Sequence, residues 1–169
     1  ELNLNAIRLP IYWRDLLNRV QVQTPLESMN IMINGWAIYQ TLASRILGRT
    51  GFYQSGGAYG FRDQLQDTIC LKYVNPELTK KQIIKHSEHQ FIQGDVEHWW
   101  HEETQKGIRT RFSDDLLWLP FLVAEYINYN LQADREGCIA HRFGRVVNTC
   151  EFAICKSMTK AIEAKEERD

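Results

Sequence analysis

A short polar stretch at residues 61–67 carries the side chains best suited to chemistry. Arg62 and Gln66 are four residues apart, and so are Asp63 and Asp67. On a helix this spacing places them in two adjacent stripes of one face. Guanidinium, carboxylate and amide groups gathered there can donate and accept many hydrogen bonds, which a polyhydroxylated ligand such as a sugar requires. The spacing therefore predicts a sugar-binding site at the start of a helix.

The same residues also fit a plain helix start that binds nothing. Acidic side chains in a first helical turn complement the helix dipole without any ligand. Asp63 and Asp67 nevertheless repel each other, at a cost of roughly a few tenths of a kcal/mol unless donors or cations intervene. Phe61, Leu65 and Ile69 share the other face of this helix and can pack inward. From the residues alone, both interpretations stay open.

Residues 86–101 contain several side chains that could bind a metal. They are His86, His89, Asp95, His98 and His101. Histidine and carboxylate are ordinary zinc ligands, but no spacing here matches a known zinc pattern such as His-Glu-x-x-His. We therefore expect no metal site, and a metal-dependent helical hydrolase is only a third hypothesis for the function.

Two further acids, Asp114 and Asp115, directly follow Ser113 at the start of another expected helix. Acids in the first turn after a capping serine are usually solvated. Arg109 and Arg111 nearby are suitable partners for these carboxylates or for a phosphate. Residue types alone do not separate a structural role from a binding role.

The composition narrows the class of protein. A chain of 169 residues fits one domain, and its net charge of −1 argues against nucleic acid or an anionic membrane as the main partner. No apolar run is long enough to cross a bilayer. The cysteines, Cys70, Cys138, Cys150 and Cys155, contain no Cys-x-x-Cys pair and are interpreted as reduced thiols. We expect a cytoplasmic protein without membrane insertion.

Hydrophobic periodicity predicts helices and no convincing strand. Helices are expected at about residues 11–20, 25–47, 61–74, 76–94 and 113–127. Thr24, Pro25 and Glu27 form a strong helix start. The helix that follows is apolar on almost every side, so we expect other helices to bury it. The pattern predicts an all-α fold of stacked helical hairpins, in which residues 94–103 are a loop.

Several motifs together resemble one enzyme family. The run Gly57 to Asp67, Gly-Ala-Tyr-Gly-Phe-Arg-Asp-Gln-Leu-Gln-Asp, resembles the signature of the inverting β-glycoside phosphorylases, glycoside hydrolase family ninety-four. Similar motifs occur in order at residues 12–17, 29–40, 93–101 and 109–120. The resemblance covers about residues 10–127 and looks most like the β-1,2-glucan branch, which includes the phosphorylase-like domain of cyclic β-1,2-glucan synthases.

The resemblance implies a fold and a substrate. Residues 1–127 would be a fragment of an (α/α)6 barrel catalytic domain that phosphorolyses a β-linked glucan or oligosaccharide to glucose 1-phosphate. It would use inorganic phosphate as co-substrate and no other cofactor. Arg62, Asp63 and Asp67 would bind sugar hydroxyls, and Gln66, His98, Trp99, Asp114 and Asp115 would be further substrate contacts. Trp99 or Trp100 could offer a face to a pyranose, whereas core packing of both is the alternative.

The resemblance also leaves parts of such an enzyme out. An inverting phosphorylase needs a carboxylic acid that protonates the glycosidic oxygen. In the family this acid follows a Trp-x-Asp pattern beyond the matched region, as do the phosphate-binding residues. The one Trp-x-Asp here, Trp13-Arg14-Asp15, lies upstream and is interpreted as structural. A catalytically inactive sugar-binding or structural fragment is therefore the second hypothesis.

The remainder of the chain shows no resemblance. Residues 128–145 are polar and turn-like, and residues from about 147 onward could form one amphipathic helix with a charged end. The chain starts inside a helical pattern, which suggests an excised piece. Because part of a barrel leaves apolar helix faces without neighbours, we expect the isolated chain to self-associate or to be marginally folded.

Overall fold

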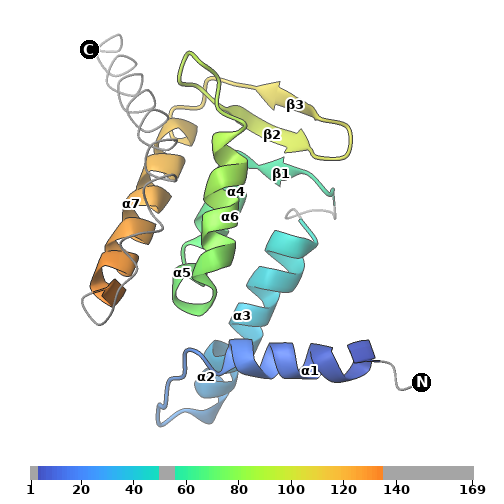
Figure 1. The fold of residues 1–169 in the computed structure, drawn as a ribbon, viewed down its shortest axis with the longest axis vertical. Helices are drawn as coiled ribbons and strands as arrows, with labels where there is room; N and C mark the ends of the chain where they lie inside the picture. The colour runs from blue at the N-terminus through green and yellow to red at the C-terminus, as the bar shows by residue number, and fades with distance from the viewer. Residues whose placement is uncertain (1–3, 50–55, 135–169) are drawn as a thin grey trace.

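The computed structural model describes residues 4–49 and 56–134, and it is rich in helix (Figure 1). The helical elements are α1 (Leu4–Leu17), α2 (Glu27–Ile31), η1 (Met32–Trp36), α3 (Ala37–Gln40), η2 (Thr41–Leu47), α4 (Phe61–Thr68), α5 (Leu71–Val74), α6 (Pro76–Ser87) and α7 (Asp115–Asp134), where η1 and η2 are π-helical. The strands are β1 (Tyr59–Gly60), β2 (Glu97–His101) and β3 (Lys106–Arg109). None of the helices in these two ranges is long and apolar enough to cross a membrane.

The small sheet corrects the expectation that the chain has no strand. Its order is β1-β2-β3 with both pairs antiparallel, and it lies at one end of α4, α6 and α7 (Figure 1). Residues 97–101, expected to be a loop, form its central strand. Their aromatic side chains favour strands. However, Trp100 pairs with Tyr59 and Trp99 with Ile108, and hydrophobic periodicity along the chain does not detect pairing between distant residues.

The main core joins this sheet to three helices. Phe61 and Leu65 of α4 are fully buried, as are Trp100 of β2 and Leu122 of α7. They belong to one cluster that also takes Ile83 from α6. The inward face predicted for residues 61–69 is confirmed by this cluster, because Ile69 also packs against it. The core therefore fixes the start of α4 against the sheet.

The helices differ from expectation at several boundaries, and the helix expected from Pro25 begins at Glu27 without a side-chain cap. The helix α6 starts at Pro76 as predicted, and Asn75 caps it by accepting a hydrogen bond from the Leu78 amide at 3.2 Å, but α6 ends at Ser87 rather than near Gly94. A tight turn follows, in which Gly94 has a φ of 91° that glycine adopts easily. At the other end, α7 continues through Asp134, so residues 128–134 are helical rather than turn-like. The amphipathic helix expected after residue 147 lies outside the described residues.

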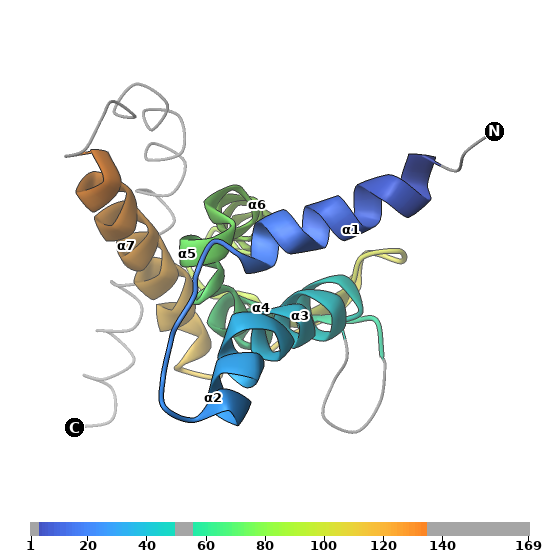
Figure 2. The ribbon, with the colours of Figure 1, turned by 90° about the horizontal axis from the view of Figure 1, so that it is seen from below.

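The helical stretch from α2 through η2, here named the 27–47 helix, is not buried as expected. Leu42 and Ile46 are buried in a second cluster with Leu16 of α1, and Ile38 packs against that cluster. Its exposed apolar side chains are Met29, Ile31, Met32, Trp36, Tyr39 and Leu47. Figure 2 shows α1 and this helix projecting from the side of the molecule opposite α7. In the described chain, Trp13 of α1 contacts this surface at Tyr39, and the side chains named above nevertheless stay exposed.

Candidate functional site

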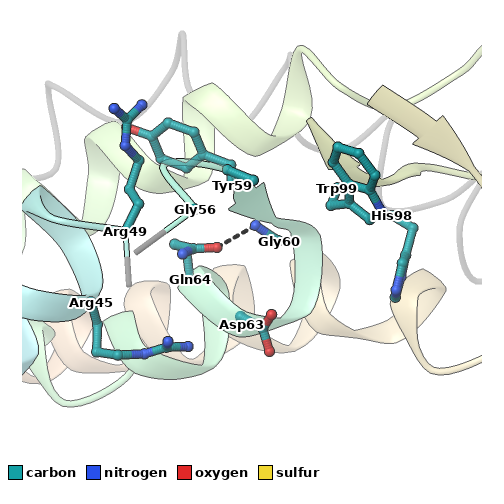
Figure 3. Close-up of a pocket in the computed structure, with 10 residues that line it drawn as sticks. Arg45, Arg49, Gly56, Tyr59, Gly60, Asp63, Gln64, His98 and Trp99 are labelled. Atoms are coloured by element: carbon teal, nitrogen blue, oxygen red, sulfur yellow. Dashed lines mark hydrogen bonds between the residues drawn. The ribbon is translucent and has the colours of Figure 1, made fainter. Parts of the chain in front are cut away.

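A cavity of about 250 Å³ lies where the 27–47 helix, β1, α4 and β2 meet (Figure 3). Its lining residues are Arg45, Arg49, Gly56, Ala58, Tyr59, Gly60, Asp63, Gln64, His98 and Trp99. Small-molecule sites typically have volumes of about 300–1,000 Å³, so this cavity suits one small ring rather than a long ligand. Three predicted site residues, Asp63, His98 and Trp99, line it together although they come from two separate motifs.

Asp63 is the carboxylate of this cavity. Among the described residues, no hydrogen bond or ion pair to its side chain is found, so both of its oxygens can accept bonds from a ligand. The backbone beside it is tightly fitted. Gly60 donates its amide hydrogen to Oε1 of Gln64, and a Cβ at position 60 would lie 2.5 Å from Oδ2 of Asp63. The absence of a side chain at position 60 therefore leaves room for the carboxylate.

Asp67 lies outside the lining residues and already has a partner. Its Oδ2 accepts a hydrogen bond from Nε of Arg45 at 2.6 Å. Burial raises the pKa of the Asp67 carboxyl above its ordinary value, and the bond to Arg45 opposes that shift. This pair joins α4 to the 27–47 helix and holds Arg45 at the cavity wall.

Arg62, Gln66 and Asp114 form a separate surface cluster. An Arg62 Nη1 hydrogen is donated to Oδ2 of Asp114 at 2.8 Å, and Nε of Arg62 lies 3.3 Å from Oε1 of Gln66. The Arg62 guanidinium also lies over the ring of Trp118, 5.3 Å from its centroid. The four side chains connect the start of α4 to the start of α7, and none of them lines the cavity.

Asp115 lies behind His98 rather than in the cavity wall. It is 2% exposed, and its Oδ2 is 2.6 Å from Nδ1 of His98. Phe112 stacks on the His98 ring with 4.7 Å between centroids. Burial raises the pKa of the Asp115 carboxyl, and His98 opposes that shift. The two neighbouring acids thus differ, because Asp114 is only half-buried and Asp115 is buried against a cavity histidine.

The two tryptophans of β2 also have different roles. Trp100 is fully buried and stacks on Tyr59 at 5.3 Å and on His89 at 3.8 Å. Trp99 points to the other face of the strand and lines the cavity, and Figure 3 shows its ring and that of His98 extending in opposite directions from β2. The alternative that both are core residues is correct for Trp100 only.

The other candidate metal ligands are engaged in separate contacts. His86 is fully buried, and Nδ1 lies 2.8 Å from the carbonyl oxygen of Gln82; desolvation lowers the pKa of His86 to about 4. His89 pairs with Glu97 at 2.8 Å, and Arg109 donates to Asp95. Over residues 4–49 and 56–134, no three histidine, cysteine or acidic side chains gather as a metal site would require.

Sequence reasoning missed several residues at the cavity. Tyr59 has two cations near its ring, with Arg49 5.0 Å and Lys85 4.4 Å from the ring centroid. Arg49 also donates to Glu103 at 2.8 Å, which ties the β2–β3 turn to the end of the 27–47 helix. The sequence does contain a signal for Arg45 and Arg49. They lie at the end of an apolar helical pattern, just before a glycine-rich stretch, and each arginine can donate several hydrogen bonds to a ligand.

Comparison with known proteins places the chain in a family. The family model described as "Glycosyl hydrolase 94 superfamily, catalytic domain" matches residues 12–167, past residue 127, where the motif resemblance ends. The chain is 48% identical over 115 residues to the cyclic beta-(1,2)-glucan synthase NdvB of Rhizobium meliloti (strain 1021), covering 68% of this chain and 4% of that protein. It is 28% identical over 144 residues to the N,N'-diacetylchitobiose phosphorylase of Vibrio proteolyticus, covering 69% of this chain and 18% of that protein.

A third relative is also a phosphorylase. The chain is 32% identical over 76 residues to the N,N'-diacetylchitobiose phosphorylase of Vibrio furnissii, covering 43% of this chain and 10% of that protein. The chain thus spans under a fifth of the length of each of these relatives. The family match covers both the cavity and the helices that build it, and this chain belongs to the glycosyl hydrolase 94 superfamily, within its catalytic domain.

Proposed function

We propose that this chain supplies part of the sugar-binding floor of an inverting β-glucoside phosphorylase-type domain. The parent activity is phosphorolysis of a β-linked glucan, with a β-1,2 linkage, to glucose 1-phosphate, with inorganic phosphate as co-substrate. The arrangement of helices belongs to a partial (α/α)6 barrel in this proposal, and the protein acts in the cytoplasm. The glucan synthase and the phosphorylases among the relatives support a carbohydrate substrate.

The observation that carries the proposal is that Asp63, His98 and Trp99 line one cavity. A pyranose has an apolar face that packs on an indole and a rim of hydroxyls that bonds to acceptors. Asp63 and His98 provide such acceptors, and Trp99 provides the flat surface. In this arrangement Arg62, Gln66, Asp67 and Asp114 lie beside the cavity, and they hold the starts of α4 and α7 in place.

A sugar-binding piece without turnover is the second candidate, and the position of Asp15 favours it. Asp15 completes the Trp-x-Asp pattern at Trp13, but it is exposed on α1 and bonded to Arg14 at 3.0 Å. It does not line the cavity. The chain by itself therefore binds sugar in this candidate, whereas proton transfer and phosphate binding rest on other parts of the parent enzyme.

The test is sugar binding by the 169-residue chain, measured by calorimetry with the β-1,2-linked glucose disaccharide. Asp63→Asn removes a charged acceptor, which costs about 1.5–3 kcal/mol of binding, a tenfold to hundredfold weakening. Asp114→Asn is the matched control, because it removes an equal charge outside the cavity. Equal affinity in all three proteins overturns the cavity as the binding site, and no binding by the unchanged chain overturns the proposal.

Turnover is measured in the same samples. Phosphate-dependent release of glucose 1-phosphate assigns full activity to the chain, whereas binding without release supports the second candidate. A hydrolysis abolished by a chelator and restored by zinc would instead support the metal-dependent hydrolase.

A further inference from the structure

The pair of Asp115 and His98 has a geometry that a helix start alone does not require. Asp115 is the first residue of α7 and could complement the helix dipole there. A more accessible acid serves that purpose equally well, and the side chain of the neighbouring Asp114 is 45% exposed. Asp115 is instead 2% exposed, and burying a carboxylate is costly unless it gains strong partners.

The two carboxylate oxygens of Asp115 differ in their hydrogen-bond partners. Oδ2 lies 2.6 Å from Nδ1 of His98, whereas Oδ1 is buried without a hydrogen-bond partner among the described residues. A buried acceptor without a partner costs about 1–3 kcal/mol. The carboxylate of Asp115 is therefore poorly satisfied as a purely structural group, and its one strong contact is directed at a histidine of the cavity.

This contact decides which nitrogen of His98 carries the proton. A carboxylate oxygen only accepts, so the ring must donate a hydrogen from Nδ1. In the neutral ring, Nε2 then has the free lone pair. Phe112 stacks on one face of the ring, and Nε2 has no hydrogen-bond partner within residues 4–49 and 56–134. Asp63 and Asp114 are the other charged groups that act on Asp115.

We propose that Asp115 is a positioning residue that acts through His98, holding the ring proton on Nδ1 so that Nε2 accepts a hydrogen bond from a sugar hydroxyl in the cavity. This role rests on the proposed sugar-binding function. It distinguishes Asp115 from Asp114, its neighbour in sequence, and it makes His98 an acceptor rather than a donor.

The experiment observes the ring nitrogens of ¹⁵N-histidine-labelled chain by NMR, above the ordinary histidine pKa of about 6.5. His98→Gln identifies the His98 signals. In the unchanged chain, the proton is expected on Nδ1. Asp115→Asn is expected to move it to Nε2, because the new amide can donate to Nδ1, as in the serine-protease triad variant with the same substitution. Asp114→Asn is the matched control and should leave the proton on Nδ1.

A proton found on Nε2 of His98 in the unchanged chain overturns the proposal, and this measurement needs no substitution of Asp115. The proposal is also overturned if the ring proton of His98 stays on Nδ1 in a folded Asp115→Asn chain. Titration with methyl β-glucopyranoside is then followed at His98 and at the Trp99 indole. A change at Nε2 and at Trp99 supports the role of Asp115. A change at Trp99 alone overturns that role only, whereas no change at either ring overturns the proposed function and the ligand role of His98 with it.

Discussion

Nε of Arg45 lies 2.6 Å from Oδ2 of Asp67, and this pair joins the 27–47 helix to α4 across 22 positions of sequence. Both side chains are partly buried, with exposed fractions of 31% and 26%. Asp67 is therefore a contact between elements and not only a helix-start acid that repels Asp63. This changes the expected effect of its removal.

Asp67→Asn should lower the free energy of unfolding by about 1 kcal/mol, because the partly buried guanidinium of Arg45 loses a charged acceptor. Relief of repulsion from Asp63 recovers only about 0.3 kcal/mol of this. Denaturant titration of the two proteins measures the difference. Asp63→Asn is the control, since it relieves the same repulsion without breaking an ion pair. A neutral or stabilising effect of Asp67→Asn would show that the pair contributes nothing.

Acidification should destabilise the chain through His86. Desolvation lowers the pKa of this buried histidine from 6.5 to about 4, so between these values the unfolded state binds the extra proton. The contribution of neutral His86 to the free energy of unfolding is therefore complete above about pH 6.5. It is lost as the pH falls toward 4, by about 3 kcal/mol in all. Thermal midpoints between about pH 7 and pH 5 measure this slope.

The control for this slope uses two histidine variants. His86→Gln should flatten it, whereas His101→Gln should not. Asp67 and Asp115 act in the opposite sense, because burial raises the pKa of each and their stabilisation is lost as the pH rises above the ordinary aspartate value. An unchanged slope in His86→Gln would assign the pH dependence to other groups.

The two adjacent tryptophans should respond very differently to truncation. Trp100→Ala removes a fully buried ring and should cost about 3–5 kcal/mol of stability. Trp99→Ala should cost about 1 kcal/mol and should weaken sugar binding. Chemical denaturation and sugar titration of both variants test this, and equal stability losses would contradict the assignment of Trp99 to the cavity.

The sequence predicts those features of the fold and the candidate site that depend on residues close together in the chain. Helical periodicity predicts the inward face of α4, and Asn75-Pro76 predicts the start of α6. Asp63, His98 and Trp99 were expected at the site and share its cavity. The contacts that distinguish Asp67 from Asp63, or Asp115 from Asp114, are made with Arg45 and His98, which lie on other elements. Spacing on one helix carries no information about such partners, and the short strands were missed for the same reason.

Exposed apolar side chains on α1 and the 27–47 helix should make the isolated chain self-associate. Trp36, Tyr39 and Tyr12 are 53%, 40% and 47% exposed, and Trp13 contacts both tyrosine rings. Large exposed apolar surfaces usually drive association. Sedimentation velocity over a range of concentrations should show a rising average mass, and Met32→Lys together with Trp36→Lys should lower it. A sharp, concentration-independent thermal transition from a clean monomer would contradict this prediction.

The close approach of Asp63 to Gly60 has a consequence for how the binding preference of this domain could be altered in evolution or by engineering. Gly60 has a φ of −103°, which any L-residue can adopt, so alanine is conformationally acceptable there. Its methyl group would nevertheless need the place now taken by the Asp63 carboxylate, 2.5 Å away. One added carbon atom would therefore reorient the acceptor while every functional group of the cavity stayed the same. Under the proposed function, position 60 is a place where ligand selectivity can change without the loss of any of the proposed sugar-binding side chains.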